Sequence, residues 1–206
     1  MARGRFYVIE GADGVGSTTQ SHRLADNLRL AGRTVHQTAE PSKGPIGLVI
    51  RQLLGGDRPR TQIHRELALL FAADRLDHMA REVEPALAAG NDVVSDRYVM
   101  SSLVYQSLDL PFDWVRDLNR FAPPADSTIL ISLPAEEAWA RLDARLQAGG
   151  ATREVFDQKT TQSRIHSEYE RQAKRQNAII VDGRGGPDEV AARVKGALIA
   201  TATWPR

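Results

Sequence analysis

The chain has 206 residues, of which 42% are hydrophobic and 26% are charged, a mixture typical of one compact soluble domain. Its formal net charge of +1 gives no electrostatic reason to expect nucleic acid or a membrane surface as a partner, and the absence of cysteine excludes disulfide bonds and thiolate metal sites. No segment has the apolar length of a signal peptide or a membrane span, so we expect a cytoplasmic protein.

Short apolar runs alternate with longer helical patterns along the chain. The runs are rich in β-branched residues and bounded by turn residues, which predicts strands over 6–10, 34–38, 92–95, 128–133 and 178–181. Strands that alternate with helices favour a parallel sheet covered on both faces. We therefore expect one α/β domain over 1–206, with five parallel strands and helices on both faces.

The helical segments have apolar residues at i, i+3 and i+4. One apolar face from Leu67 to Leu87 predicts a long helix, which Thr61 could cap. Two more helices are predicted around 139–146 and 190–198, the second with Pro187 at its start. Glycines and small residues between two helical patterns predict a lid near 147–157.

The segment "GADGVGSTTQ", residues 11–20, follows the first predicted strand directly. Its glycine and threonine spacing is typical of a P-loop, in which backbone N–H groups face phosphate at the positive end of a helix. The residue before Thr18 is usually lysine in such loops, and here it is Ser17. A glycine-rich turn without a ligand is the alternative. We predict a P-loop NTPase-like, three-layer fold whose site for ATP phosphates consists of Gly11, Gly14, Gly16, Ser17, Thr18 and Thr19.

Two charged residues stand where the third predicted strand ends, Asp96 and then Arg97. A carboxylate at the carboxyl end of a parallel strand faces the ligand crevice, where it can hold Mg²⁺ together with the Thr18 hydroxyl. A guanidinium beside it can bind a phosphate through its planar fork. The alternative is a surface charge pair that closes the strand.

Several segments, in the same order along the chain, resemble motifs of the thymidylate kinase family. They are "GADGVGSTTQ", "TAEPSKGPIGLVIRQLL", "LLFAADRLDH", "VVSDRYVMSSLVYQ", "FAPPADSTILISLPAEEAWARLDAR" and "TREVFDQKTTQSRIHSEYERQA". The resemblance covers nearly the whole chain and is closest to the archaeal-type branch. Two positions depart from the motifs, because Ser17 replaces the loop lysine and Ala39 replaces the arginine of Thr-Arg-Glu-Pro.

The resemblance implies transfer of a phosphoryl group from ATP to dTMP with Mg²⁺, in a homodimer. It implies that Asp13 faces the sugar and phosphate of dTMP and that Arg97 and a lid arginine, Arg153, act with it in catalysis. The dTMP site then consists of Asp13, Phe71, Arg75, Arg97, Ser102 and Tyr105. Within it the Phe71 ring stacks on thymine, Arg75 meets the carbonyl edge of the base, and Tyr105 crowds the 2′ position of the sugar.

Each of these residues also has a simpler interpretation. Asp13 could be a turn residue, Phe71 a core side chain and Tyr105 a packing residue with a polar tip. The two lost cations favour an alternative function, a nucleotide-binding protein with little or no kinase activity. A third hypothesis is a kinase for another nucleoside monophosphate. The five histidines show no metal-ligand spacing, so we interpret them as surface or satisfied residues.

Overall fold

The computed structural model describes residues 2–149, 156 and 159–205. At its centre lies a five-stranded sheet in the order β2-β3-β1-β4-β5, in which all neighbours are parallel. The strands are β1 (Phe6–Glu10), β2 (Val35–Ala39), β3 (Asp92–Asp96), β4 (Ser127–Ser132) and β5 (Ile179–Asp182). Each end lies within one residue of the prediction from sequence, so the predicted parallel α/β fold is confirmed.

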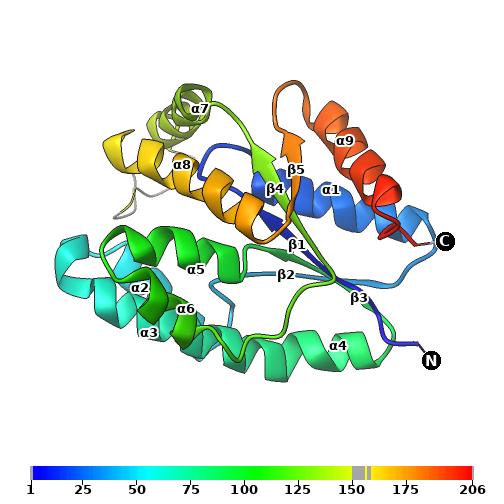
Figure 1. Cartoon of the computed structure of the whole chain (residues 1–206), viewed down its shortest axis with the longest axis horizontal. Coiled ribbons are helices and arrows are strands. Elements are labelled where there is room, and N and C mark those ends of the chain that lie inside the picture. The colour runs from blue at the N-terminus through cyan, green and yellow to red at the C-terminus, as the bar shows by residue number, and fades with distance from the viewer. Residues whose placement is uncertain (1, 150–155, 157–158, 206) are drawn as a thin grey trace.

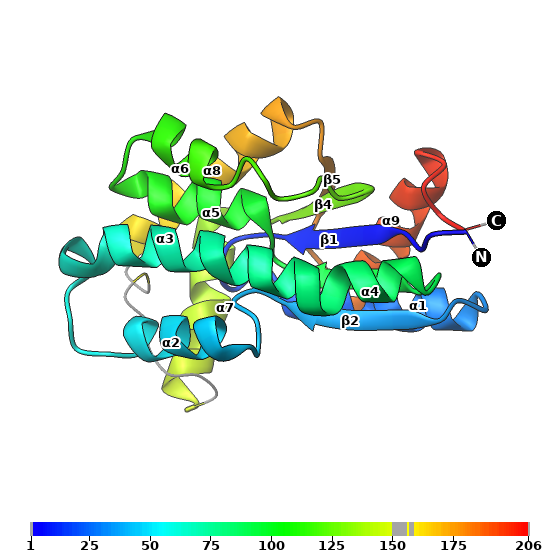
Figure 2. The same cartoon turned by 90° about the horizontal axis from the view of Figure 1, so that it is seen from below.

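Alternate residues of β1 pack into two hydrophobic clusters, one on each face of the sheet, as expected for a strand buried on both faces. Tyr7 and Ile9 belong to one cluster with residues of α1 (Ser17–Leu30) and α9 (Pro187–Ala200). Phe6 and Val8 belong to a second cluster with residues from 79 to 87 on the opposite face. Helices therefore cover both faces of the sheet (Figures 1 and 2).

The remaining helices gather mainly beyond the carboxyl ends of the strands. They are α2 (Pro45–Leu54), α3 (Arg60–His78), α5 (Val99–Tyr105), α6 (Phe112–Leu118), α7 (Ala135–Gln147) and α8 (Lys159–Arg175). α8 packs along α5 and contacts β4. Both termini lie at the other end of the sheet (Figure 1). The crevice at the carboxyl ends is thus walled by helices, which is where open parallel sheets bind ligands.

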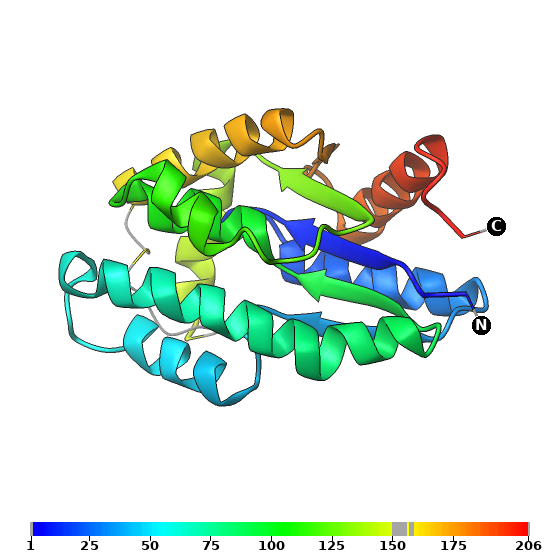
Figure 3. The ribbon, with the colours of Figure 1, turned by 60° about the horizontal axis from the view of Figure 1, so that its bottom comes forward.

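The long helix predicted over 67–87 exists, but it is not a uniform α-helix. α3 continues into a π-helical turn, η1 (Met79–Val83), and then into α4 (Glu84–Ala88), as one rod along the sheet (Figure 3). Pro85 gives the physical reason, because its ring lacks an N–H and crowds the carbonyl group four residues earlier, where a wider turn leaves room. Met79, Val83 and Leu87 remain buried, so the apolar face is continuous.

The prediction that Thr61 caps this helix is wrong. The helix begins one residue earlier, after Pro59, and no side chain caps it. Pro59 has φ −57° and ψ 142°, so its backbone is extended and the chain turns helical at the next residue. Thr61 is then the second helical residue, beyond the position at which a hydroxyl can cap.

Two further expectations concern the second half of the chain. Pro187 is the first residue of α9, and the Glu189 carboxylate accepts a hydrogen bond from the Gly186 amide at 2.9 Å. The lid predicted near 147–157 begins where α7 ends, at Gln147, but most of it, including Arg153, lies outside the described residues. Within the part of the chain that is described, no helix is long and apolar enough to cross a membrane.

Candidate active site

The loop between β1 and α1 has the backbone shape that the glycine spacing predicts. Gly14 has φ +85° and Gly16 has φ +93°, a left-handed conformation that residues with a side chain rarely adopt. Gly16 is the N-cap of α1, and no side chain caps that helix. The first amides of α1 therefore lack an internal partner and point out of the helix, as anion sites at helix N-termini require.

Close packing excludes a side chain at Gly14. A Cβ there would lie 2.1 Å from the carbonyl oxygen of Ala138 in α7. The loop is therefore seated on α7, and an arginine could not replace this glycine without moving the helix. Ser17, at the lysine position, is the first residue of α1 and is 5% exposed.

Thr18 and Asp96 meet across the gap between α1 and β3. The Thr18 hydroxyl donates a 2.6 Å hydrogen bond to Asp96 Oδ2, while Asp96 Oδ1 is buried and has no hydrogen-bond partner among the described residues. A free carboxylate oxygen beside a hydroxyl is a donor set that suits Mg²⁺, which usually takes one or two carboxylates, waters and substrate phosphates. The described residues contain no cluster of three or more His, Asp or Glu side chains that could hold a metal without a substrate.

A cavity of about 340 Å³ opens at the carboxyl ends of β1, β2 and β3. Eight predicted site residues line it: Asp13, Thr18, Phe71, Arg75, Asp96, Arg97, Ser102 and Tyr105. The register explains part of this meeting, because Asp96 pairs with Ile9 on one side and with Ala39 on the other. The structure thus brings together residues that lie far apart in the sequence.

Arg97 and Asp13 form an ion pair at the centre of this cavity. Arg97 NH2 lies 2.7 Å from Asp13 Oδ1, and the Tyr105 hydroxyl donates to Asp13 Oδ2 at 2.8 Å. Burial alone would lower the pKa of Arg97, but Tyr105, Tyr169 and the nearby carboxylates raise it well above its usual value. Arg97 also has φ +73°, a conformation uncommon for a residue with a side chain and often found at functional sites.

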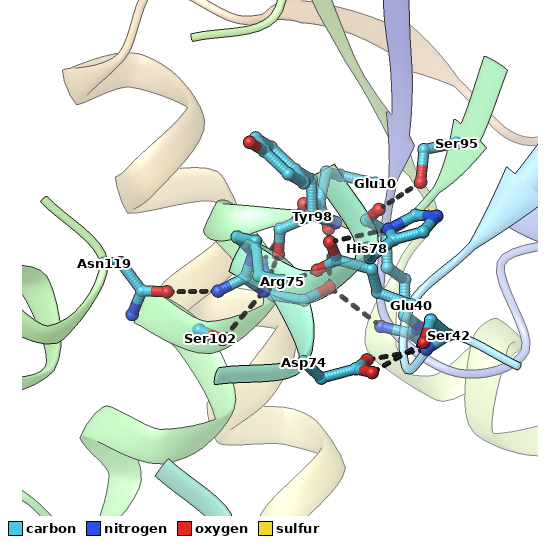
Figure 4. Close-up of polar contacts among 12 residues, drawn as sticks. Glu10, Glu40, Ser42, Asp74, Arg75, His78, Ser95, Tyr98, Ser102 and Asn119 are labelled. Carbon is cyan, nitrogen blue, oxygen red and sulfur yellow. Dashed lines mark hydrogen bonds and ion pairs between the residues drawn. The ribbon is translucent and has the colours of Figure 1, made fainter. Parts of the chain in front are cut away.

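Arg75 is held at the other end of the cavity by a network shown in Figure 4. Its NH2 group lies 2.7 Å from Glu40 Oε2 and donates to Ser102 Oγ and the Tyr98 carbonyl oxygen, both at 3.1 Å. NH1 donates to Asn119 Oδ1, and the side chain is only 1% exposed. Its Nε is buried and has no hydrogen-bond partner among the described residues. The Nε–H of this arginine is therefore left for a ligand.

α3 also fixes the loop that follows β2. Asp74, next to Arg75, accepts hydrogen bonds from the Ser42 amide at 2.7 Å and the Ser42 hydroxyl at 2.6 Å. One turn later, His78 contacts Thr38 Oγ1 at 2.7 Å. It also lies 3.3 Å from Glu40 Oε1, beside which Figure 4 shows it. The loop that lines the cavity with residues 39–41 is thus tied to the helix that carries Phe71 and Arg75.

The thymidylate kinase family has a sequence model that matches residues 9–194 of this chain. The chain belongs to the thymidylate kinase family. Three archaeal proteins named "Probable thymidylate kinase" are among its relatives. The one from Thermococcus onnurineus is 43% identical over 148 residues, which is 68% of this chain and 72% of the relative. The one from Methanococcus aeolicus is 39% identical over 166 residues (80% and 77%), and the one from Caldivirga maquilingensis is 35% identical over 179 residues (86% and 84%).

Several residues of this thymidylate kinase cavity were not assigned from the sequence. They are Glu40, Pro41, Arg51, Leu54, Tyr98, Ser101, Gln106 and Phe156, together with Ala39. Arg51 lies in a segment that resembles the family, but nothing in the spacing of α2 distinguishes an arginine that faces a cavity from one that faces solvent. Glu40 could have been found from its motif, since a buried Arg75 requires a carboxylate partner.

The histidines agree only in part with the prediction that they are surface or satisfied residues. His78 is buried and hydrogen-bonded, and His36 pairs with Glu82 at 2.8 Å. His64 Nδ1 and His166 Nε2, in contrast, are buried without a hydrogen-bond partner among the described residues. Burial lowers the pKa of His166, although Asp13, the Leu133 carbonyl group and Glu170 oppose this.

Proposed function

We propose that this thymidylate kinase transfers the γ-phosphoryl group of ATP to dTMP and gives dTDP and ADP, with Mg²⁺ bound by Thr18 and Asp96. One observation carries the proposal: a single cavity of about 340 Å³ joins the P-loop threonine and the strand-end carboxylate to the Phe71–Arg75 pair. Phosphoryl transfer depends mainly on positioning and charge neutralisation, so donor and acceptor sites must share one space.

The acceptor end of the cavity suits a pyrimidine with a carbonyl group. Phe71 lines the wall with a ring on which a base can stack. The Arg75 Nε is the free donor there, and a donor favours a keto oxygen over the amino group of cytosine. Ser102, which already accepts a bond from Arg75, has its own hydrogen to donate to the base. Tyr105 stands beside Asp13, where it would crowd a 2′-hydroxyl group.

The phosphates of the two substrates would meet between the P-loop and Arg97. The uncapped amides that follow Gly16 bind the donor phosphates, with Gly11, Gly14, Ser17 and Thr19 forming the rest of the loop. Bound Mg²⁺ would neutralise charge on the donor phosphates. Arg97, oriented by Asp13, binds the acceptor phosphate. Arg153 is proposed as the lid arginine by family resemblance alone.

A second candidate is a nucleotide-binding protein of the same fold with little turnover. The observation that favours it is the loss of two cations, because Ser17 stands at the lysine position and the Ala39 side chain lines the cavity where the motif has arginine. Backbone amides, Mg²⁺ and Arg97 remain to carry the reaction. We therefore propose a slow enzyme rather than an inactive one.

A coupled assay of ADP release tests these alternatives. We expect Mg²⁺-dependent turnover with dTMP, the acceptor that the family resemblance implies, and with dUMP, which carries the same keto groups. Turnover with dCMP should be lower, because Arg75 Nε favours a keto oxygen over an amino group, and turnover with dGMP should be lower because a purine is larger than a pyrimidine. Equal rates with all four nucleotides would contradict the assignment of the base site. Binding of dTMP and ATP without ADP release would establish the second candidate.

We also propose that the chain forms a homodimer, as the family resemblance implies. α3 supports this because Leu69 and Leu76, seven residues apart on one side of the helix, are 51% and 42% exposed. Light scattering should give twice the 22.7 kDa mass of the chain. A monomeric mass would contradict the proposal and leave the assignment of the reaction intact.

A further inference from the structure

We infer that Tyr169, supported by Glu10, is a positioning residue that orients Arg97 toward the phosphate of the acceptor. The inference deepens the proposed function and rests on it. Tyr169 belongs to α8, the helix that follows the predicted lid, and it is not among the site residues predicted from the sequence. Its side chain is 2% exposed, so its hydroxyl group must find its partners inside the protein.

The hydroxyl groups of Tyr169 and Ser101 both contact the guanidinium of Arg97. Arg97 NH1 donates to Tyr169 Oη at 2.9 Å and to Ser101 Oγ at 3.3 Å, while NH2 is occupied by Asp13. The two hydroxyl oxygens lie 2.7 Å apart. The guanidinium is therefore held from the P-loop, from α5 and from α8 at once.

The direction of these hydrogen bonds follows from the chemistry of the groups. A guanidinium can only donate, so both hydroxyl oxygens must turn lone pairs toward Arg97. Their hydrogens then need acceptors of their own. Ser101 Oγ donates to Glu10 Oε2 at 2.6 Å, and the Tyr169 hydroxyl donates to Ser101 Oγ at 2.7 Å or to Glu10 Oε2 at 3.3 Å, so Glu10 ends the chain of hydrogen bonds.

Glu10 is itself fixed at the end of β1. It is 0% exposed, and its Oε1 accepts hydrogen bonds from the Tyr98 amide at 2.9 Å and the Ser101 amide at 3.2 Å. These bonds leave the carboxylate no freedom to turn. Glu10 thus fixes the positions of the two hydroxyl groups, and these in turn fix the orientation of Arg97.

Arg97 needs this support because its surroundings pull it in more than one direction. Its side chain pairs with Asp13, and the charge of Asp96 also attracts it, so that both carboxylates, after Tyr105 and Tyr169, raise its pKa. Asp13 alone would leave NH1 free to turn toward either carboxylate. Tyr169 instead fixes NH1, which keeps the plane of the guanidinium constant for a two-point contact with phosphate.

The test removes one hydroxyl group and separates phosphate binding from base binding. Calorimetry should compare dTMP with thymidine, which offers the same base and sugar but no phosphate. We expect Tyr169→Phe to weaken dTMP binding about ten-fold, or ~1.4 kcal/mol, and to leave thymidine binding unchanged. In the assay KM for dTMP should rise while KM for ATP stays constant.

Tyr7→Phe is the matched control. Tyr7 is equally buried, and its hydroxyl donates one hydrogen bond to the Thr203 carbonyl at 2.9 Å, at the end of the sheet away from the cavity. This variant should bind both ligands like the wild type. Ser101→Ala gives the same test if Tyr169→Phe does not fold, and in an Arg97→Ala background neither change should weaken dTMP binding further.

Two results would overturn the inference alone. One is that the wild-type chain binds dTMP and Tyr169→Phe binds it with the same affinity. The other is an equal loss for dTMP and thymidine, which would mean a distorted pocket rather than a misplaced arginine. A wild-type chain that does not bind dTMP at all would overturn the proposed function, and this inference with it.

Discussion

The acceptor and donor ends of the cavity are built in different ways. At the acceptor end, buried side chains hold one another: Arg75 is tied to Glu40 and Asn119, and Arg97 to Asp13 and Tyr169. At the donor end the binding groups are mostly backbone amides, with the Thr18–Asp96 pair as the main polar contact between side chains. A binding site made of backbone tolerates substitution better, which explains how the loop keeps its shape with Ser17 in place of lysine.

The largest effect is expected for Asp96, where the two ends meet. Asp96→Asn keeps the shape of the side chain but removes the charge that we propose binds Mg²⁺. We expect kcat to fall on the order of 10²–10³-fold, because a preorganised charge near the transferred group is lost. The Mg²⁺ concentration for half-maximal rate should rise as well, which a titration of the rate with Mg²⁺ measures.

Thr18→Val provides the comparison for Asp96→Asn. It removes the hydroxyl group that contacts Asp96 Oδ2 and leaves the carboxylate. We expect a smaller loss of rate, again with a rise in the Mg²⁺ concentration that gives the half-maximal rate. If Asp96→Asn leaves the rate and its metal dependence unchanged, the carboxylate is structural and the proposed metal site is wrong.

The sequence was sufficient to predict features that depend on local pattern. The strands were placed within one residue because β-branched runs are bounded by turn residues, and the P-loop was placed by its glycines. It did not predict the π-helical turn, where Pro85 acts on the preceding turn through geometry rather than periodicity.

Contacts between residues far apart in the sequence were harder to predict. Tyr169 lies 72 residues from Arg97, and as one apolar residue on a helix face it is indistinguishable from a core side chain. Glu10 likewise reads as the polar end of a strand, and its role depends on Ser101 and Tyr169, which only the fold brings close. Family resemblance supplied Phe71, Arg75 and Tyr105, which the spacing alone could not separate from packing residues.

A smaller effect of opposite sign is expected at the donor end. Ser17→Lys should restore a cation beside the donor phosphates and raise kcat about ten-fold, or ~1.4 kcal/mol of barrier. ATP binding, which we expect to be weaker than dTMP binding in the natural chain, should tighten in calorimetry. Ser17→Met is the matched control, since it adds a side chain of similar length without a charge.

The outcome depends on whether another cation already replaces the lysine. The candidates are Lys43, which is exposed in the loop after β2, and Arg153, which lies outside the described residues. Lys43→Ala and Arg153→Ala should cost little if the defect is uncompensated. If Ser17→Lys gives no gain and kcat collapses in one of the alanine variants, the residue replaced in that variant supplies the missing charge.

The smallest effect concerns how the stability of the fold depends on pH, and it has opposite signs for Glu10 and Asp182. Burial raises the pKa of Glu10 above its ordinary 4.5, although hydrogen bonds from Ser101 and the charge of Arg97 oppose this. Its folded pKa therefore exceeds its unfolded pKa, and the stability linked to its protonated form is lost as the pH rises above 4.5. Glu10→Gln cannot ionise, so its stability relative to the wild type should improve as the pH rises above 4.5.

Asp182, the last residue of β5, should behave in the reverse way. The hydrogen bonds from Arg184 lower the pKa of Asp182 from 3.8 to about 2, so its contribution is present above pH 3.8 and lost as the pH falls. Asp182→Asn should therefore be less stable than the wild type at neutral pH, with the difference shrinking toward about pH 2. Urea midpoints of both variants across this pH range measure the two slopes. Parallel slopes would contradict the distinction between the buried carboxylate of Glu10, which is costly to ionise, and the exposed carboxylate of Asp182, whose ionisation is favoured.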